Sequence, residues 1–122
     1  MYKVFSLSVV VVFISFVGLS QKTKVLFIGN SYTAYNNLSQ LTYDAALSTG
    51  DTLFYDEHTP GGQRLLNHVA SPTTISKIFS NKWDYVVLQA QSQEPSWPIQ
   101  QVQQEVFKPA KILCDTIRAN YS

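Results

Sequence analysis

The sequence predicts an α/β fold with a parallel sheet, and three observations support this prediction. Short apolar runs suited to buried strands occupy residues 24–28, 52–55 and 84–88. Segments with helical spacing of apolar residues separate these runs, and a polar loop follows each run. Strands that alternate with helices pair in parallel through right-handed crossovers, so the loops that follow the strands should all open at one edge of an open sheet.

The first half of the chain is expected to hold two strands and one helix. The first strand has the sequence KVLFI. A helix is predicted over 37–48, where apolar residues recur close to every 3.6 positions, and Gly50 marks its end. The second strand should end at Tyr55, and a loop over 56–62 carries the turn-forming sequence Pro-Gly-Gly.

The second half is expected to hold the third strand and several helices. A helical pattern covers 65–70, and Ser71 followed by Pro72 is typical of the start of a further helix. A polar loop follows the third strand. The last helix is predicted over 100–118, with an interruption or kink near Pro109 because proline cannot donate a backbone hydrogen bond.

The first twenty residues have the pattern of a secretory signal peptide. Lys3 precedes an apolar stretch, and Gly18 and Ser20 place small residues at the positions that favour cleavage. The division expected is therefore a signal peptide over 1–20 and one small domain over 21–122. The protein is then secreted or periplasmic.

A retained membrane anchor is the alternative for this segment. The apolar stretch over 4–19 would span about 24 Å as a helix, short of a bilayer core of about 30 Å. Stable membrane insertion after cleavage is therefore not expected. Without Lys3 the nine basic side chains become eight and balance the eight acidic ones. Neither sign forms a cluster, which argues against nucleic acid or an anionic membrane surface as a partner.

Ser31 is the candidate nucleophile. It follows the first strand in the sequence KVLFIGNSYT, and the carboxyl end of a strand is where parallel α/β sheets bind ligands. The alternative is that Ser31 caps the next helix or shapes a turn.

The sequence around Ser31 resembles the first conserved block of the SGNH (GDSL-like) serine hydrolases, with Gly-Asn-Ser in place of the commoner Gly-Asp-Ser. The resemblance continues over 59–63 and 83–93 and so covers most of the chain after residue 20. It implies a flavodoxin-like three-layer α/β/α fold with a parallel sheet. On this resemblance the chain is the N-terminal part of such a hydrolase domain, truncated after the third strand and its helix.

The resemblance also implies the donors that would stabilise an oxyanion. Gly62, in Thr-Pro-Gly-Gly-Gln, corresponds to a glycine that offers its backbone N–H, and Ser31 would offer its own N–H. Gln93 lies where the family usually has asparagine, and Gln89 or Gln91 could supply the amide donor instead. The alternatives are a tight turn that needs positive φ at the glycines, and a glutamine-rich surface loop.

One part of the family pattern is absent. The family's last block carries an Asp and a His, and nothing in this chain matches it. His58 could approach the edge of the site, whereas His68 is interpreted as a surface or packing residue. Neither takes the family's role of general base, so the sequence of this chain does not by itself identify it as an enzyme. The missing strands would also leave an unpaired sheet edge, with Val86 and Leu88 incompletely covered.

The leading hypothesis is a secreted serine esterase of the SGNH type that hydrolyses acyl esters and is incomplete in this chain. The resemblance implies small-molecule or carbohydrate esters as substrates, including O-acetyl groups on carbohydrate. No metal-binding cluster, phosphate loop or dinucleotide motif occurs, so no cofactor or metal is expected. The alternatives are a non-catalytic secreted carbohydrate-binding remnant and a truncated product without a stable function. The stacking surfaces of the remnant would be Tyr32, Tyr35, Trp83 and Trp97.

Overall fold

The computed structural model describes residues 22–122, and the predicted signal peptide over 1–20 lies outside the described part of the chain. Three parallel strands form the middle layer: β1 (Thr23–Ile28), β2 (Leu53–His58) and β3 (Tyr85–Leu88). β1 lies in the centre, between β2 and β3. It pairs with β2 over its whole length and with β3 from Val25 onward. The predicted parallel sheet is therefore confirmed.

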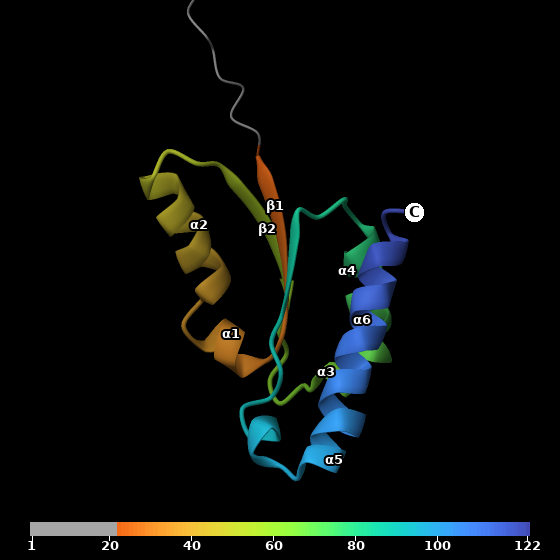
Figure 1. Cartoon of the computed structure of the whole chain (residues 1–122). Coiled ribbons are helices and arrows are strands. Elements are labelled where there is room, and N and C mark those ends of the chain that lie inside the picture. Colours follow the sequence, from red (N-terminus) through yellow and green to blue (C-terminus); the bar gives the residue numbers. More distant parts are fainter. Residues whose placement is uncertain (1–21) are drawn as a thin grey trace, which may run out of the picture.

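Helices cover the sheet from both sides (Figure 1). α1 (Ser31–Tyr35) and α2 (Leu38–Ser48) lie on one side. The other side carries α3 (Leu65–Val69), α4 (Pro72–Phe79) and α6 (Lys108–Ala119). The fold is thus a three-layer α/β/α arrangement of the flavodoxin-like type, as the sequence predicted.

The chain between β3 and α6 contains three short turns of helix. They are the 3₁₀-helix η1 (Glu94–Ser96), α5 (Ile99–Val102) and the π-helix η2 (Gln103–Phe107). η2 runs directly into α6, whose second residue is Pro109. Because proline has no N–H to donate, the wider π turn accommodates the gap in the hydrogen-bond ladder, and the predicted interruption near Pro109 is confirmed.

Two elements, β2 and α1, differ from the prediction. β2 extends to His58, through residues that were expected to form a loop. Its acidic side chains are partnered: Asp56 binds Lys77, and Glu57 accepts a hydrogen bond of 2.6 Å from Ser39. α1 was not predicted, because five residues are too few to show a helical period.

The hydrophobic core is divided by the sheet into two unequal parts. The larger part lies between the sheet and the helices α3 to α6 and is made of Leu26, Ile28, Leu65, Ile78, Trp83, Val102, Val106 and Leu113. The smaller part lies under α2 and contains Val25, Phe27 and Leu53. Side chains on β1 alternate between the two, so the central strand is buried on both faces.

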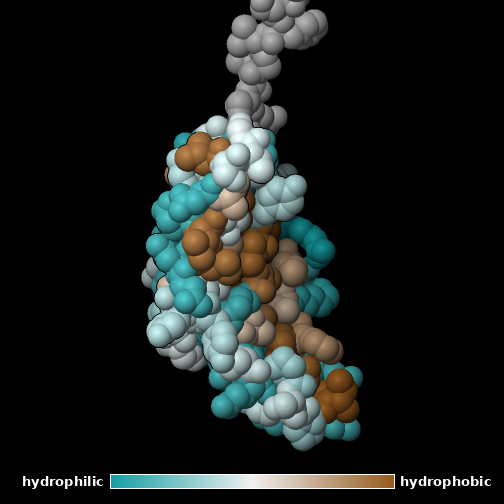
Figure 2. Space-filling model, turned by 90° about the vertical axis from the view of Figure 1, so that its left-hand side faces the viewer, coloured by the Kyte–Doolittle hydropathy of each residue, from teal (hydrophilic) through white to brown (hydrophobic). Residues whose placement is uncertain are grey.

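The face of β3 on the α2 side is open to solvent. Tyr85 and Val87 are exposed by 65% and 38%. They pair with Val25 and Phe27 of β1, whose side chains belong to the smaller core, so they face the same side of the sheet. Figure 2, which views this side of the molecule, shows apolar surface gathered along its middle. Val86 and Leu88, expected to lack cover, are half-buried and pack against the larger core. The incomplete cover is thus on the opposite face of the strand.

Candidate functional site

Ser31 lies at the carboxyl end of the central strand and is the first residue of α1. It is exposed and lines a hollow of about 210 Å³ together with Tyr32, Tyr35 and Asn36. The helix cap is Asn30, because its Oδ1 accepts a hydrogen bond of 3.1 Å from the N–H of Tyr32. The alternative that Ser31 caps the next helix is therefore wrong. Within residues 22–122, no hydrogen bond engages the Ser31 hydroxyl.

Gln89, the first residue after β3, holds the loop that leads to Ser31. Its Oε1 accepts hydrogen bonds from the N–H of Asn30 at 2.9 Å and from the hydroxyl of Thr33 at 3.1 Å. Its Nε2 donates to the carbonyl of Ala90. Gly29 leaves room for this arrangement, since a Cβ there would lie 2.7 Å from Gln89 Oε1. Gln89 was considered as an oxyanion donor, but here its amide oxygen anchors the loop.

The two histidines lie beside this loop. His68 is 1% exposed, its Nε2 is 2.7 Å from the carbonyl oxygen of Gly29, and its Nδ1 is 2.9 Å from Thr74 Oγ1. The interpretation of His68 as a surface residue is wrong, while the packing alternative holds. The ring of His58 lies 5.5 Å from that of His68. Within the described residues, no hydrogen bond joins either ring to Ser31.

Both imidazoles favour the neutral form. Burial lowers the pKa of His68, and the nearby His58 adds to this effect, while the hydrogen bond to Gly29 opposes it. Burial also lowers the pKa of His58, together with the positive charge of Lys77 and against the opposing effect of Asp56. A neutral imidazole can act as a base, but neither ring is placed against the Ser31 hydroxyl.

Gly62 lies in the loop after β2 and is exposed. Its φ is +72°, in the left-handed region that favours glycine, whereas Gly61 has no such requirement. The tight-turn alternative therefore applies to Gly62. The turn ends at Gln63, whose carbonyl accepts a hydrogen bond of 2.8 Å from Asn30 Nδ2. The loop that carries Gly62 is in this way joined to the loop that carries Ser31.

Gln93 lies in the loop after β3, immediately before η1, and its side chain is exposed. Its N–H donates to Oε1 of Gln91 at 2.7 Å, which uses the amide oxygen of Gln91 to shape the turn. The N–H of Gln91 in turn donates to Glu94 Oε2 at 2.9 Å. Of the three glutamines considered as amide donors, Gln93 is the one whose side chain is exposed.

An arginine cluster joins the loops that follow β2 and β3. Arg64 Nε and Nη2 each lie 2.7 Å from a carboxylate oxygen, the first of Glu94 and the second of Glu105. The Glu94 side chain is fully buried, and the guanidinium stacks over the ring of Trp97 at 4.7 Å. Hydrogen bonds to Glu105 and Glu94 raise the pKa of Arg64, and the bond to Arg64 lowers the pKa of Glu105.

The three loops are therefore linked in pairs, as the shared sheet edge predicts. Asn30 joins the first loop to the second, Gln89 joins the first to the third, and Arg64 joins the second to the third. In the described part of the chain, hydrogen bonds connect the neighbours of Ser31, Gly62 and Gln93 rather than these three residues themselves.

Sequence reasoning missed the roles of His68, Arg64 and Glu94. For His68 a signal existed: it follows Leu65 by three positions on a helix, which places both on one face, and Leu65 is buried in the core. Arg64 and Glu94 are 30 residues apart, and no local pattern pairs them.

The aromatic surfaces proposed for sugar stacking are reduced to two. Trp83 is 3% exposed and stacks on Phe54, so its use as a stacking surface is wrong. Trp97 packs against the larger core, and Arg64 lies over one face of its ring. Tyr32 and Tyr35 are exposed by 66% and 86% and lie beside Ser31.

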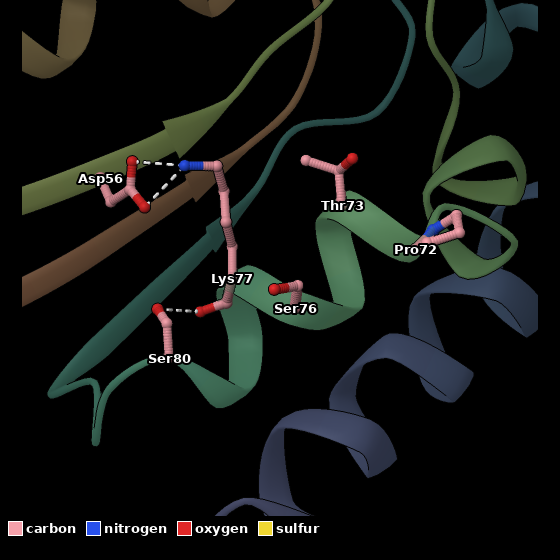
Figure 3. A pocket seen from close by; sticks show the side chains of 6 residues that line it. All are labelled: Asp56, Pro72, Thr73, Ser76, Lys77 and Ser80. Atoms are coloured by element: carbon pink, nitrogen blue, oxygen red, sulfur yellow. Dashed lines mark hydrogen bonds and ion pairs between the residues drawn. The ribbon is translucent and has the colours of Figure 1, made fainter.

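A second hollow lies between α4 and the outer strand β2 (Figure 3). It measures about 520 Å³ and is lined by Asp56, Pro72, Thr73, Ser76, Lys77 and Ser80. Lys77 Nζ lies 2.7 Å from both carboxylate oxygens of Asp56, so its charge is already neutralised. The hollow shares no lining residue with the one at Ser31.

Residues 22–122 contain no group of three or more His, Cys, Asp or Glu side chains that could hold a metal ion. No helix in this part of the chain is long and apolar enough to cross a membrane. Comparisons with protein-family models, curated proteins and solved structures found no match to the chain.

Proposed function

We propose that the chain is the N-terminal part of a secreted serine esterase of the SGNH type. The observation that carries the proposal is the placement of Ser31: it is exposed at the carboxyl end of the central strand, on a loop that is hydrogen-bonded to both other loops. Parallel α/β sheets bind ligands at this edge, and an exposed serine on a fixed loop suits attack on an acyl carbon.

In this proposal the Ser31 hydroxyl attacks the carbonyl carbon of an ester, the acyl–oxygen bond breaks and the alcohol leaves with a proton returned by the base. Water then hydrolyses the acyl-enzyme, which releases the carboxylic acid and restores Ser31. The backbone N–H groups of Ser31 and Gly62 and the side-chain amide of Gln93 would donate to the oxyanion. The substrate is a small-molecule or carbohydrate ester, with O-acetyl groups on carbohydrate as the class that the family resemblance favours.

The proposal requires a general base. Both ring nitrogens of His68 are engaged away from Ser31, and His58 makes no hydrogen bond to Ser31 within the described residues. In this proposal the proton of Ser31 passes to a histidine, or a histidine–carboxylate pair, from outside residues 22–122. Residues 22–122 alone should show little or no turnover.

The test is hydrolysis of p-nitrophenyl acetate by the full-length gene product and by its Ser31→Ala variant. Removal of the nucleophile should lower kcat by a factor on the order of 10⁴ or more. Ser92→Ala is the matched control, because Ser92 is an exposed serine in a loop at the same sheet edge and should be dispensable. Turnover retained in Ser31→Ala would refute the proposal.

A non-catalytic carbohydrate-binding protein is the second candidate, favoured by the exposure of Tyr32 and Tyr35 beside the hollow at Ser31. Binding of an acetylated oligosaccharide without hydrolysis, weakened by Tyr32→Ala and unaffected by Ser31→Ala, would select this function. Tyr85→Ala is the matched control, because Tyr85 is as exposed as Tyr32 but lies at the start of β3.

A further inference from the structure

His68 makes a contact that core packing does not require. Its imidazole is 1% exposed and both ring nitrogens have polar partners, the carbonyl of Gly29 at 2.7 Å and the hydroxyl of Thr74 at 2.9 Å. Gly29 and His68 are 39 residues apart, on β1's outgoing loop and on α3. An apolar side chain would fill the same space, but it would leave the buried carbonyl of Gly29 without this donor.

The hydrogen-bond partners of His68, the Gly29 carbonyl and the Thr74 hydroxyl, determine which ring nitrogen carries the proton. A carbonyl oxygen only accepts hydrogen bonds, so His68 Nε2 must carry a proton. The Thr74 hydroxyl can then donate to Nδ1 of a neutral imidazole. Burial disfavours the charged form, which is consistent with this assignment. His68 is therefore expected to be neutral, with its proton on Nε2.

The hydrogen bond between His68 and the Gly29 carbonyl adds to other hydrogen bonds that hold the backbone before Ser31. The N–H of Gly29 donates to the carbonyl of His58 at 3.1 Å, and the N–H of Asn30 donates to Gln89. The carbonyl of Asn30 accepts from two N–H groups of α1. With the carbonyl of Gly29 bound to His68, the backbone N–H and the carbonyl of both Gly29 and Asn30 are hydrogen-bonded.

We propose that His68 is a positioning residue for Ser31. His68 lies on α3, the helix that follows the Gly62 loop, and its Nε2–H donates to the Gly29 carbonyl. This hydrogen bond determines the position of the Ser31 loop relative to the Gly62 loop. This inference rests on the proposed esterase function. His68 does not touch the reacting atoms; it acts through the peptide that leads to Ser31. A displacement of about 1 Å at a nucleophile can lower a rate by about 10²-fold.

The test compares two replacements of His68 in the full-length gene product, with p-nitrophenyl acetate as the substrate. His68→Leu removes the donor to Gly29 and should lower kcat by at least about 10-fold, with KM changed less than about twofold. His68→Gln restores a side-chain N–H at a similar reach and should recover kcat to within about threefold of the unmodified protein.

Ile78→Val is the control for stability, because Ile78 is fully buried in the larger core, on α4. It should shift the denaturation midpoint and leave kcat unchanged. Unchanged kcat in folded His68→Leu, or an equal fall in Ile78→Val, would overturn the positioning role. If Ser31→Ala and the unmodified protein have the same activity, the proposed esterase function fails instead.

A nuclear magnetic resonance measurement tests the contact without activity and without a variant that must fold. Correlation of the His68 ring nitrogens with their protons should show a neutral ring protonated on Nε2 at pH 7. This result supports the contact to Gly29. A ring protonated on Nδ1 alone would overturn the inference, whatever the activity.

Discussion

Two networks hold the loops at the carboxyl edge of the sheet, and they differ in charge. The neutral network around the nucleophile loop uses amide and imidazole groups and consists of Gly29, Asn30, Gln63, His68 and Gln89. The arginine cluster, which joins the other two loops, consists of Arg64, Glu94, Glu105 and Trp97. The first should be insensitive to salt, because none of its groups is charged. The arginine cluster combines a pair with a buried carboxylate, Arg64–Glu94, and a partly exposed pair, Arg64–Glu105. These two arms of the cluster should respond differently to mutation and to salt.

The largest expected effect is the loss of Arg64. Arg64→Met leaves the buried carboxylate of Glu94 without its cation and should lower the free energy of unfolding by about 3 kcal/mol. This is the lower end of the range for breaking a buried pair, since Arg64 itself is 25% exposed and water can enter. Urea denaturation measures the change.

The double variant Arg64→Met, Glu94→Gln is the control for this prediction. Neutralising the stranded carboxylate should recover part of the stability lost in Arg64→Met. If the double variant is less stable than the single one, the buried charge is not the source of the loss.

The next largest effect is expected in the neutral network, at Gly29. In Gly29→Ala the new Cβ would lie 2.7 Å from Gln89 Oε1 and 2.8 Å from Thr33 Oγ1. Gln89 must then move and give up its bonds to the loop, at a cost of about 2 kcal/mol in the free energy of unfolding. Gly61→Ala is the matched control: its Cβ would meet nothing within 4 Å, so stability should change by less than about 0.5 kcal/mol. Equal effects at the two glycines would show that the contacts around Gly29 are not tight.

A smaller effect is expected from pH. Because the pKa of His68 is lowered in the folded protein, the unfolded chain binds the proton first as the pH falls below about 6.5. Stability should be complete well above this value and should decline between pH 7.5 and 5.5. The pKa of His58 is lowered as well, so it adds to the decline. Urea denaturation of His68→Gln at both pH values should show a weaker dependence; an unchanged dependence would assign the decline to other groups.

The smallest effect is expected at the exposed arm of the arginine cluster. Glu105→Gln removes the charge of a partly exposed partner of Arg64 and should destabilise the protein slightly at low salt. At about 1 M salt, where the screening length is about 3 Å, the difference from the unmodified protein should become smaller. Glu94→Gln should keep its effect under the same conditions, because that pair is buried. Equal salt dependence of the two variants would contradict the division of the cluster into a buried and an exposed arm.

The sequence allowed the sheet to be predicted because the apolar runs of β1 and β3 are local signals. The end of β2 was missed because Asp56 and Glu57 do not resemble strand residues, and their partners Lys77 and Ser39 come from helices that cover the edge strand. In the site, Ser31 could be predicted from its own strand and turn. The anchoring roles of His68 and Gln89 depend on contacts between residues 39 and 59 positions apart, which only the folded chain brings together.

The central position of β1 has a consequence for synthesis. β1 is the first strand to leave the ribosome, yet one of its edges is completed only by β3, which pairs Val25 with Tyr85. At translation rates of about 5–20 residues per second, this edge remains unpaired for roughly 3–12 seconds. During that time the apolar sequence VLFI is a nascent segment able to pair with any available strand. A factor that binds extended apolar peptides would protect the chain until residue 88 has emerged.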